Sequence, residues 1–599
     1  MTDTTSTTER PTRKLEQEVL EWTEAVYQEA DHELSQSHEA KLTSKLIDYI
    51  CGRQWSQKAR FGTQRPVVNR TFAQFMEMVG LLTDLELDFA VKFTDQGVDG
   101  YSELQKLLNR MIEDWAYDSD FEMELSQAVM FGLLHTGPVK IQWNSELCDG
   151  LGDNEFQPLN PLNFMRIGDS SKAKDAEVCI SRKFVTLQYL RRRYGEVAEA
   201  VQPEIGLSQF PGETLKPARF SRVEWSRMSP ALRNLMGIRK QGAQSKFPQA
   251  LLKEFWFRDP ALWRGSESII VGDPTGNWCY RVEPGMRLYP RGRVVVTAGG
   301  KVLEDTCNPY WHGRFPFPEY RPFRVPWNLR HGLSMMEPIA AMQAILNRIN
   351  GGVMDTVIDA ISPSIIGPKG AFSPQDWDTI DPSVPAAKYA YNNNAPRPPE
   401  FKTPKQLPQY VDTFYQRVER EMDRTSGASA ISQAIAKKQV PGGDALDMIF
   451  NSRSTNIRLM ARSMKSFLNE CGQLVVSNLL QFATAQHRIM KYGPEGIVAN
   501  DLSPIYGSFL PKGMEPEEFV RKANFSIRRG SLLGIEKSEE IQFAFALRKM
   551  GDLSRHRLLR FLDRNIDIKA NDQELHEELA EKALIAAAAG NIAGKGKHK

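Results

Sequence analysis

The pattern of apolar and polar positions changes period several times along the chain. Apolar residues recur every three or four positions in segments expected to be helical and every second position in expected strands. The expected helices are 13–51, 72–85, 101–135, 187–194, 337–361, 408–424, 538–550, 554–562, 572–589 and a long helix from 444 through at least 474. The expected strands are 87–93, 139–143, 178–184, 251–258, 278–282, 292–297 and 525–527. Mixed along one chain, these elements predict an α+β fold.

The expected helix 408–424 (PQYVDTFYQRVEREMDR) is polar and carries charges of both signs. Pro408 suits the start of a helix, where its missing N–H is not needed. The apolar positions step by three and four and predict one narrow buried stripe, made by Val411, Phe414, Val418 and Met422. A helix this polar is typical of a surface, or of a face that meets water inside an assembly.

The segment that follows (TSGASAISQAIAKKQVPGG, 425–443) is rich in glycine, alanine and serine. It can bury little apolar surface, so we expect it to be mobile. Lys437 and Lys438 lie near its tip and are available to a polyanion, although a solvated loop tip is the more common role for such a pair. Asp444 then N-caps the long helix. Two rows with a spacing of seven give that helix a continuous packing seam: Phe450, Ile457, Met464 and Cys471, and Met460, Phe467 and Leu474.

Composition narrows the class of protein. Hydrophobic residues make up 41% and charged residues 25%, which is ordinary for a globular protein, and the net charge is only +2. Contact with nucleic acid is therefore expected to be local or non-specific. Six scattered cysteines without a CxxC pair indicate neither a zinc site nor a disulfide framework. We expect no secretory signal and no membrane span, because the first residues are polar and no run of about 18 apolar residues occurs.

Motifs for catalysis are missing from the sequence. It contains no GxSxG, no HExxH and no Gly-rich dinucleotide fingerprint. The segment GNIAGKG (590–596) resembles a phosphate loop, but it has one residue too few between its glycines and no Ser or Thr after the lysine. Asp149, Asp153 and Glu155 lack the spacing of a calcium loop and are expected to form a solvated turn. We therefore expect no enzymatic activity, no cofactor and no metal site.

Several short motifs follow one another in a recognisable order between about 45 and 565. They are GRQW, RPVVNR, VKIQW, NPLNF, GDSS, LRRRYG, YPRGRVVVTAGGKVL, NPYWHGRFPF, HGLSMMEPIAAMQAILNRI, GGDAL, NFSIRRGS and MGDLSRHRLLRFLD. In this order they make the chain similar to the portal proteins, or head–tail connectors, of tailed double-stranded DNA bacteriophages. Each motif is weakly specific by itself, and the order carries the resemblance.

The resemblance implies a portal-like multidomain subunit that assembles into a ring. It has a mixed α/β wing, a helical stem, a small clip, a long spine helix and a helical crown. The implied parts are a disordered tail (1–12), the wing (13–330), the first stem helix (331–361), the clip (362–407), the second stem helix (408–425), the tunnel loop (426–443), the long helix and return to the wing (444–524), the crown (525–589) and a basic flexible tail (590–599).

The same resemblance implies the function. Portal proteins form a dodecameric ring at one vertex of the capsid, through which terminase packages the genome and through which the genome is later ejected. Implied partners are further copies of the chain, the terminase large subunit, a head-completion or tail adaptor protein, the major capsid and scaffolding proteins, and double-stranded DNA without sequence preference. The implied location is the virion vertex, and the host cytoplasm during assembly.

Candidate site residues fall into three groups, and the resemblance assigns the role of each. The tunnel loop contributes Ser432, Gln433, Lys437, Lys438 and Gln439 to the DNA channel. The stem presents Arg348, Arg417, Arg420 and Arg424 to the channel surface. The clip offers Lys369, Asp376, Trp377, Asp378 and Lys388 for docking terminase or the adaptor.

Two alternatives remain at the level of sequence. A structural ring or scaffold protein of a virion that does not conduct DNA would have residues 408–443 facing protein instead of an aqueous lumen. A nuclease-like packaging subunit would require clustered acidic residues for metal ions and a phosphate loop, and the sequence shows neither.

Overall fold

The computed structural model describes 13–55, 65–83, 89–93, 101–168, 170–203, 248–272, 279–326, 328–368, 370–373, 390–402, 408–426, 455–484 and 516–527, with single residues at 375, 380, 505 and 510. The chain divides into two compact units, one of Met1–Asp84 with Phe89–Ile527 and one of Leu85–Asp88 with Arg528–Lys599. Every described residue belongs to the first unit. That unit mixes helices and strands, as the α+β prediction requires.

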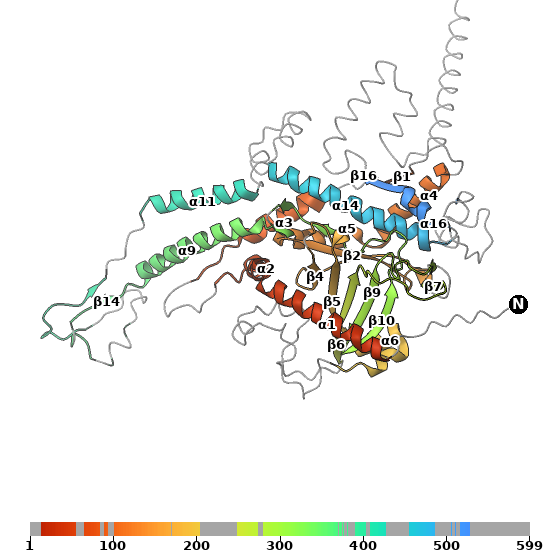
Figure 1. Cartoon of the computed structure of the whole chain (residues 1–599). Helices are drawn as coiled ribbons and strands as arrows, with labels where there is room; N and C mark the ends of the chain where they lie inside the picture. The colour runs from red at the N-terminus through yellow and green to blue at the C-terminus, as the bar shows by residue number, and fades with distance from the viewer. Residues whose placement is uncertain are drawn as a thin grey trace, which may run out of the picture. The chain divides into compact units, whose positions relative to one another are not determined.

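The main elements are labelled in Figure 1. The helices are α1 (Arg13–Gln36), α2 (His38–Ile50), α3 (Arg70–Thr83), α4 (Tyr101–Asp118), α5 (Phe121–Leu134), α6 (Leu187–Tyr194), α9 (Met336–Ile361), α11 (Tyr410–Ser426), α14 (Thr455–Phe482) and α16 (Pro516–Lys522), with short 3₁₀ helices η1 (Cys148–Gly150), η2 (Ala173–Asp175) and η3 (Gly195–Ala200).

The largest sheet has five antiparallel strands in the order β10-β9-β6-β5-β4. Its strands are β4 (Phe164–Ile167), β5 (Val178–Thr186), β6 (Gln249–Phe257), β9 (Arg293–Ala298) and β10 (Lys301–Cys307). The Gly299-Gly300 turn joins β9 to β10, and both glycines have positive φ, 53° and 72°. Positive φ is the conformation that tight hairpin turns require, and glycine adopts it without strain.

Smaller antiparallel pairings complete the strands. One sheet has the order β11-β2-β3, and four two-stranded pairings are β1 with β16, β7 with β8, β12 with β13, and β14 with β15. Their bounds are β1 (Phe89–Phe93), β2 (Gly137–Asn144), β3 (Asp153–Pro158), β7 (Ile269–Gly272), β8 (Cys279–Val282), β11 (Glu319–Tyr320), β12 (Phe323–Val325), β13 (Asn328–Leu333), β14 (Ile365–Ile366), β15 (Glu400–Phe401) and β16 (Ala523–Ile527).

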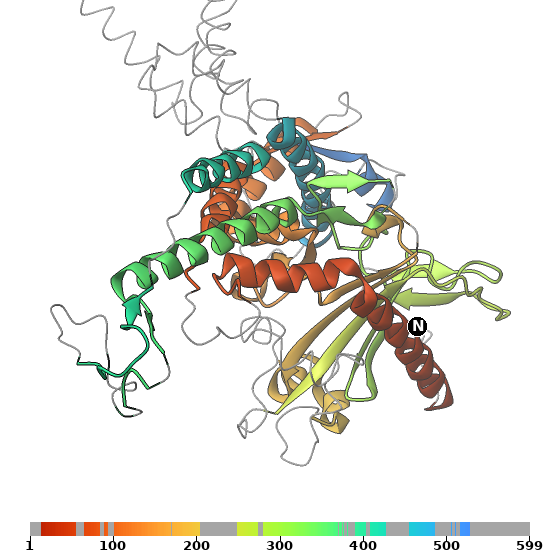
Figure 2. The same cartoon turned by 90° about the vertical axis from the view of Figure 1, so that its left-hand side faces the viewer.

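Both faces of the five-stranded sheet are covered. Tyr27 and Ala30 of α1 pack against Ile180, Phe255 and Val295 on one face, and Figure 2 shows α1 lying along this sheet. The other face packs against α6 and against aromatic residues of the segment after β10: Tyr310, Phe315 and Phe317. The Pro-rich and aromatic segment 307–326 therefore packs on the sheet, and β11 and β12 form within it.

Two long expected helices are each broken into two. The first breaks at Ser37, whose extended backbone and side-chain oxygen cap α2 by accepting a hydrogen bond from the Ala40 N–H at 3.2 Å. The second breaks at Asp120, which takes the left-handed conformation at φ 49°. Serine competes locally for backbone hydrogen bonds, and aspartate is one of the few residues besides glycine that adopt the left-handed conformation. The prediction of a single helix over 13–51 is wrong, because apolar periodicity continues across the break at Ser37 and does not show it. The helical region predicted over 101–135 is present as two helices.

The long helix α14 is the element on which much of the unit packs. It contacts α3, α4 and α16, and also the strands β2, β3, β11, β12 and β16. Its described seam residues are buried as predicted: Met460, Met464, Phe467, Cys471 and Leu474. Side-chain amides add to the apolar contact, because Gln473 donates to the Ala523 carbonyl at 2.7 Å and accepts from the Phe525 N–H at 3.0 Å.

An ion pair joins the two larger sheets. Lys140 of β2 donates to both carboxylate oxygens of Glu254 on β6, at 2.8 and 2.7 Å. Trp256 and Ser181 also donate to Glu254, at 2.7 and 3.3 Å. Burial opposes the charge on Glu254, but Lys140 and these donors outweigh that effect and lower the pKa of the carboxyl. A buried carboxylate supported in this way stays ionised and fixes one sheet against the other.

Glycine contacts give a test of the packing of α14 on β16. A Cβ at Gly472 would lie 2.1 Å from Cε1 of Phe525, whereas a Cβ at Gly80 in α3 would meet nothing within 4 Å. Glycine to alanine in a helix ordinarily stabilises by about 1 kcal/mol. We expect Gly80→Ala to raise the midpoint of thermal unfolding and Gly472→Ala to lower it. An equal rise for both variants would contradict the close contact between α14 and Phe525.

Candidate functional site

The helices α9 and α11 form an antiparallel hairpin. α9 leads to β14, which pairs with β15 through Ile365↔Phe401 and Ile366↔Glu400. α11 then returns along α9, as Figures 1 and 2 show. These helices are the two elements to which the sequence assigned the stem. The observed bounds agree with the predicted ranges to within one or two residues at most ends.

A network of buried side-chain amides holds the base of α9. Gln343 lies on the apolar face of α9 and is fully buried. Its oxygen accepts from the backbone N–H and the hydroxyl of Thr71, both at 3.3 Å. Its NH₂ donates to the Val68 carbonyl at 2.8 Å and to Asn347 at 2.9 Å. Every polar group of this side chain therefore has a partner, which is what burial of an amide requires.

The network continues from α9 into α2 and the segment before α3. Asn347 donates to the Gln54 side-chain oxygen, and Gln54 donates to Asn69 and to the Tyr49 carbonyl, both at 2.9 Å. Asn69 donates to the Ile50 carbonyl at 2.8 Å and accepts from the Phe72 N–H at 3.2 Å. The end of α2, the start of α3 and the base of α9 thus share one hydrogen-bonded system. We call Gln54, Asn69, Thr71, Gln343 and Asn347 the amide network.

Ion pairs with α3 hold the base of α11. Arg70 pairs with Glu419 and lies 3.8 Å from Asp423, and Gln74 donates to Asp423 at 2.9 Å. Burial raises the pKa of the neighbouring Glu77 carboxyl, and the charge of Asp423 raises it further. Arg70 is half-buried, and such a pair contributes about 1 kcal/mol or less. Its main effect is therefore to orient α11 instead of adding much stability.

Beyond this base the hairpin leaves apolar side chains exposed. The last buried residue of α9 is Gly351, and the first of α11 is Val418. Large exposed side chains follow on both helices: Met354 (43% exposed), Val357 (43%), Ile361 (66%), Tyr410 (71%) and Phe414 (48%). The prediction that Val411, Phe414, Val418 and Met422 form one buried stripe is therefore wrong in its first half. Only Val418 and Met422 are buried, because the described chain supplies no packing surface further out.

The four stem arginines all lie exposed on this hairpin. Arg417, Arg420 and Arg424 form one row of α11, since successive helical residues turn by about 100°. The same geometry puts that row opposite the buried Val418 and Met422. Arg424 pairs with Glu421 at 3.3 Å, and Arg420 donates to the Gln416 carbonyl at 3.2 Å. Arg348 of α9 and Arg417 make no ion pair with a described residue.

The other candidate residues lie outside the described residues. This applies to the tunnel-loop group (Ser432, Gln433, Lys437, Lys438 and Gln439), to the clip group (Lys369, Asp376, Trp377, Asp378 and Lys388) and to the N-cap Asp444. Their roles stay predictions.

The amide network is the feature of this site to which sequence reasoning assigned no role. Four of its five residues lie in three of the motifs that carry the family resemblance: GRQW contains Gln54, RPVVNR contains Asn69, and HGLSMMEPIAAMQAILNRI contains Gln343 and Asn347. One signal was available, because Gln343 and Asn347 occupy the same helical face as Ile339 and Leu346. Polar residues on an apolar face indicate a buried hydrogen-bonding partner.

The described residues show neither a membrane-spanning helix nor a metal site. None of the described helices is both long and apolar enough to cross a bilayer. In the same part of the chain, no three His, Cys, Asp or Glu side chains lie close enough together to hold a metal ion. No protein-family model and no curated protein matches the chain.

The amide network predicts a specific weakness in α9. Gln343→Met keeps the side-chain size but leaves the Thr71 donors and the Val68 carbonyl without their partner. An unsatisfied buried polar group costs roughly 1–3 kcal/mol. We expect a lower unfolding midpoint and faster hydrogen exchange in the first half of α9, measured by mass spectrometry.

Gln416→Met on α11 is the matched control, because Gln416 is exposed and its side chain donates only to Asp412, at 3.1 Å. The control should leave both readouts nearly unchanged. Equal exchange rates in α9 for the two variants would show that the amide network does not hold the hairpin base.

Proposed function

We propose that this chain is a portal subunit, which forms a ring-shaped DNA channel at one vertex of a phage capsid. The observation that carries the proposal is the α9–α11 hairpin, fixed at its base and exposed along its outer half. The order of sequence motifs supports the same function. A hairpin of this kind suits a ring, because each copy offers its outer half to the next copy around the axis.

The exposed apolar residues supply a contact between neighbouring copies. Met354, Val357 and Phe414 lie on the outer halves of the two helices and are 43–48% exposed. A ring needs a heterologous interface, in which one surface of a subunit meets a different surface of the next. Two helices with different exposed faces provide two such surfaces. Burial of these side chains between copies would supply the hydrophobic stabilisation that the single chain lacks.

The row of arginines supplies the channel surface. Arg417, Arg420 and Arg424 face away from the packing of α11, and Glu421 lies beside them. Repeated around an axis, the row becomes a band of alternating charge. Phosphate contacts of this kind carry no sequence information, and interleaved acidic residues limit the grip on DNA, so the duplex can slide.

The proposal includes the partners and the location of a portal. Terminase would dock on the clip during packaging, and the head-completion or tail adaptor would replace it afterwards. The capsid and scaffolding proteins would surround the ring during assembly in the host cytoplasm, and the finished protein would lie at the virion vertex. The chain itself would catalyse no reaction and hold no cofactor. A ring or scaffold protein that does not conduct DNA is the alternative.

Assembly tests the proposed contact between copies. We expect wild-type protein to form rings of about a dozen copies and Val357→Asp/Phe414→Asp to remain a folded monomer, because a charge at each position opposes apolar burial. Mass photometry gives the assembly state, and circular dichroism checks the fold.

The control variant is Ile270→Asp in β7, which also replaces an exposed aliphatic residue (75% exposed). This control should still form rings. Rings from the double variant would contradict the role of the hairpin in assembly. Loss of rings in the control as well would show that the effect is not specific to the hairpin.

The proposed channel role extends to the lysines of the tunnel loop. We expect Lys437→Ala/Lys438→Ala to lower the efficiency of genome packaging and to reduce its dependence on salt, because fewer phosphate contacts release fewer counterions. Packaged DNA per particle, measured at several salt concentrations, reports both effects. Normal packaging with unchanged salt dependence would refute a contact between these lysines and DNA.

A further inference from the structure

A cavity of about 730 Å³ lies beside α14. One wall is a polar row of α14, in which Arg462, Lys465, Asn469 and Gln473 recur at helical spacing. The facing walls are formed by the η2 segment, by the loop after β10 and by β16. Four segments far apart in the sequence therefore enclose one polar space.

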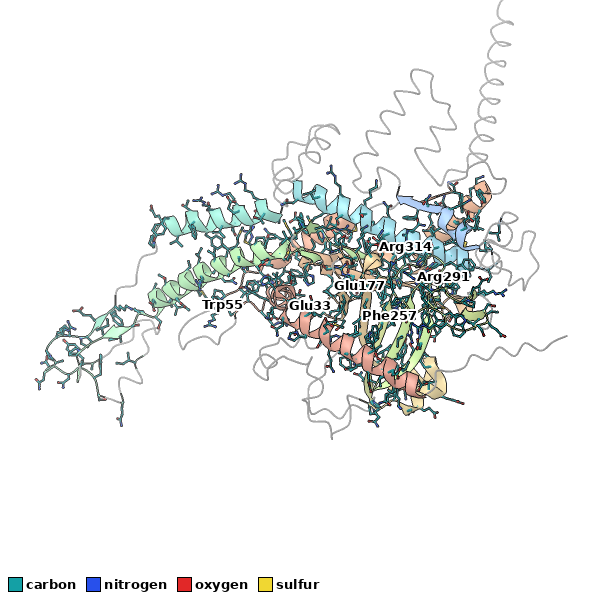
Figure 3. All side chains as sticks on the ribbon, in the orientation of Figure 1. Glu33, Trp55, Glu177, Phe257, Arg291 and Arg314 are labelled. Atoms are coloured by element: carbon teal, nitrogen blue, oxygen red, sulfur yellow. The ribbon has the colours of Figure 1, made fainter. Side chains whose placement is uncertain are left out.

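The charge of this cavity is strongly one-sided. Five basic side chains line it: Lys172, Lys174, Arg314, Arg462 and Lys465. Arg314 is labelled in Figure 3. The single carboxylate in the wall is Glu470, which pairs with Lys172 at 3.5 Å. Among the described residues no carboxylate lies within ion-pair distance of the other four basic groups.

Buried basic residues elsewhere in the unit are neutralised. Lys140, Arg166, Arg182 and Arg293 each pair with a carboxylate at 2.6–3.1 Å. The cavity differs because its basic side chains are partly buried or exposed and face a common space, and among the described residues only Lys172 has a carboxylate partner. A cleft lined by one sign of charge focuses the electric field and concentrates ions of the opposite sign.

A histidine in the wall adds a neutral donor. His312 stacks on Tyr310 at 5.1 Å between ring centroids, and its Nδ1 accepts from the Arg314 N–H at 2.9 Å. Burial lowers the pKa of His312 to about 3, together with the charges of Arg314 and Arg291. The ring is therefore neutral at physiological pH and carries its proton on Nε2. That atom is buried and has no hydrogen-bond partner among the described residues.

We propose that this cavity is a binding site for phosphate groups. Arginine and lysine side chains from three segments converge on it, and Ser466 adds a hydroxyl to its wall. Charge-assisted hydrogen bonds to phosphate are the strongest contacts these groups can make. The cavity is larger than one phosphate, so the ligand is a pyrophosphate-like group or a stretch of phosphodiester backbone. The site is separate from the stem arginines and does not depend on the proposed function.

Titration of the full-length protein tests the site. The probes are inorganic pyrophosphate and, separately, a short double-stranded DNA, each followed by isothermal titration calorimetry at constant ionic strength. The cavity variant is Arg462→Gln/Lys465→Gln. The control, Arg191→Gln/Lys301→Gln, removes the same charge from exposed positions outside the cavity. We expect pyrophosphate binding to weaken on the order of tenfold for each charged hydrogen bond that the cavity variant removes and to be unchanged in the control.

The two probes distinguish the source of the phosphate. If the cavity variant loses pyrophosphate binding and the control does not, the ligand of the site is a free phosphate compound. If the cavity variant loses only DNA binding, the ligand is a nucleic-acid backbone. A second variant from the opposite wall, Lys174→Gln/Arg314→Gln, should behave as the first does and guards against misfolding of either. Every variant keeps the arginines of α9 and α11. If the proposed channel role of those arginines is wrong, the loss of binding expected here is therefore unaffected. No binding of either probe, or equal weakening in the control, would overturn the proposal.

Discussion

Buried side-chain amides require hydrogen-bond partners, and this requirement fixes the α9–α11 hairpin from which the proposed function is inferred. Gln343 and Asn347 face the interior of the unit, where an unpaired amide is costly. Their partners lie at the end of α2 and around the start of α3, so only one orientation of α9 satisfies all of them. α11 returns along α9 and is held by Arg70 of the same α3. The direction of α9 and α11 therefore follows from residues at the end of α2 and around the start of α3.

Paired side-chain amides also determine how the rest of the unit packs on α14. Its apolar seam supplies the burial, but its side-chain amides select the partners. Gln473 bonds to the backbone of β16, and Gln481 accepts from the Trp311 N–H at 2.9 Å. Asn478 donates to Asn154 of β3 at 2.9 Å. Apolar contact alone would tolerate several helix positions, whereas paired amides tolerate one. Arg462 and Lys465 of the same helix line the basic cavity instead.

Sequence periodicity predicted the elements better than their arrangement. Strands β5, β6 and β9 and helix α6 depend on neighbours in the chain, so local patterns predicted them. The pairing of β1 with β16 and the closure of the amide network depend on residues far apart in sequence, which no local pattern encodes. The wrong prediction that Phe414 is buried had a different cause. An apolar stripe indicates that a surface is covered, but it does not say whether the same chain or another copy covers it.

The most direct test of the account is the structure of the assembled wild-type protein by electron cryomicroscopy. The account predicts closed rings with a central hole, with the α9–α11 hairpins around the axis and the row from Arg417 to Arg424 facing the lumen. A closed oligomer without a hole would contradict it. So would a ring in which these arginines are buried against protein, which is the arrangement expected of a structural ring that does not conduct DNA.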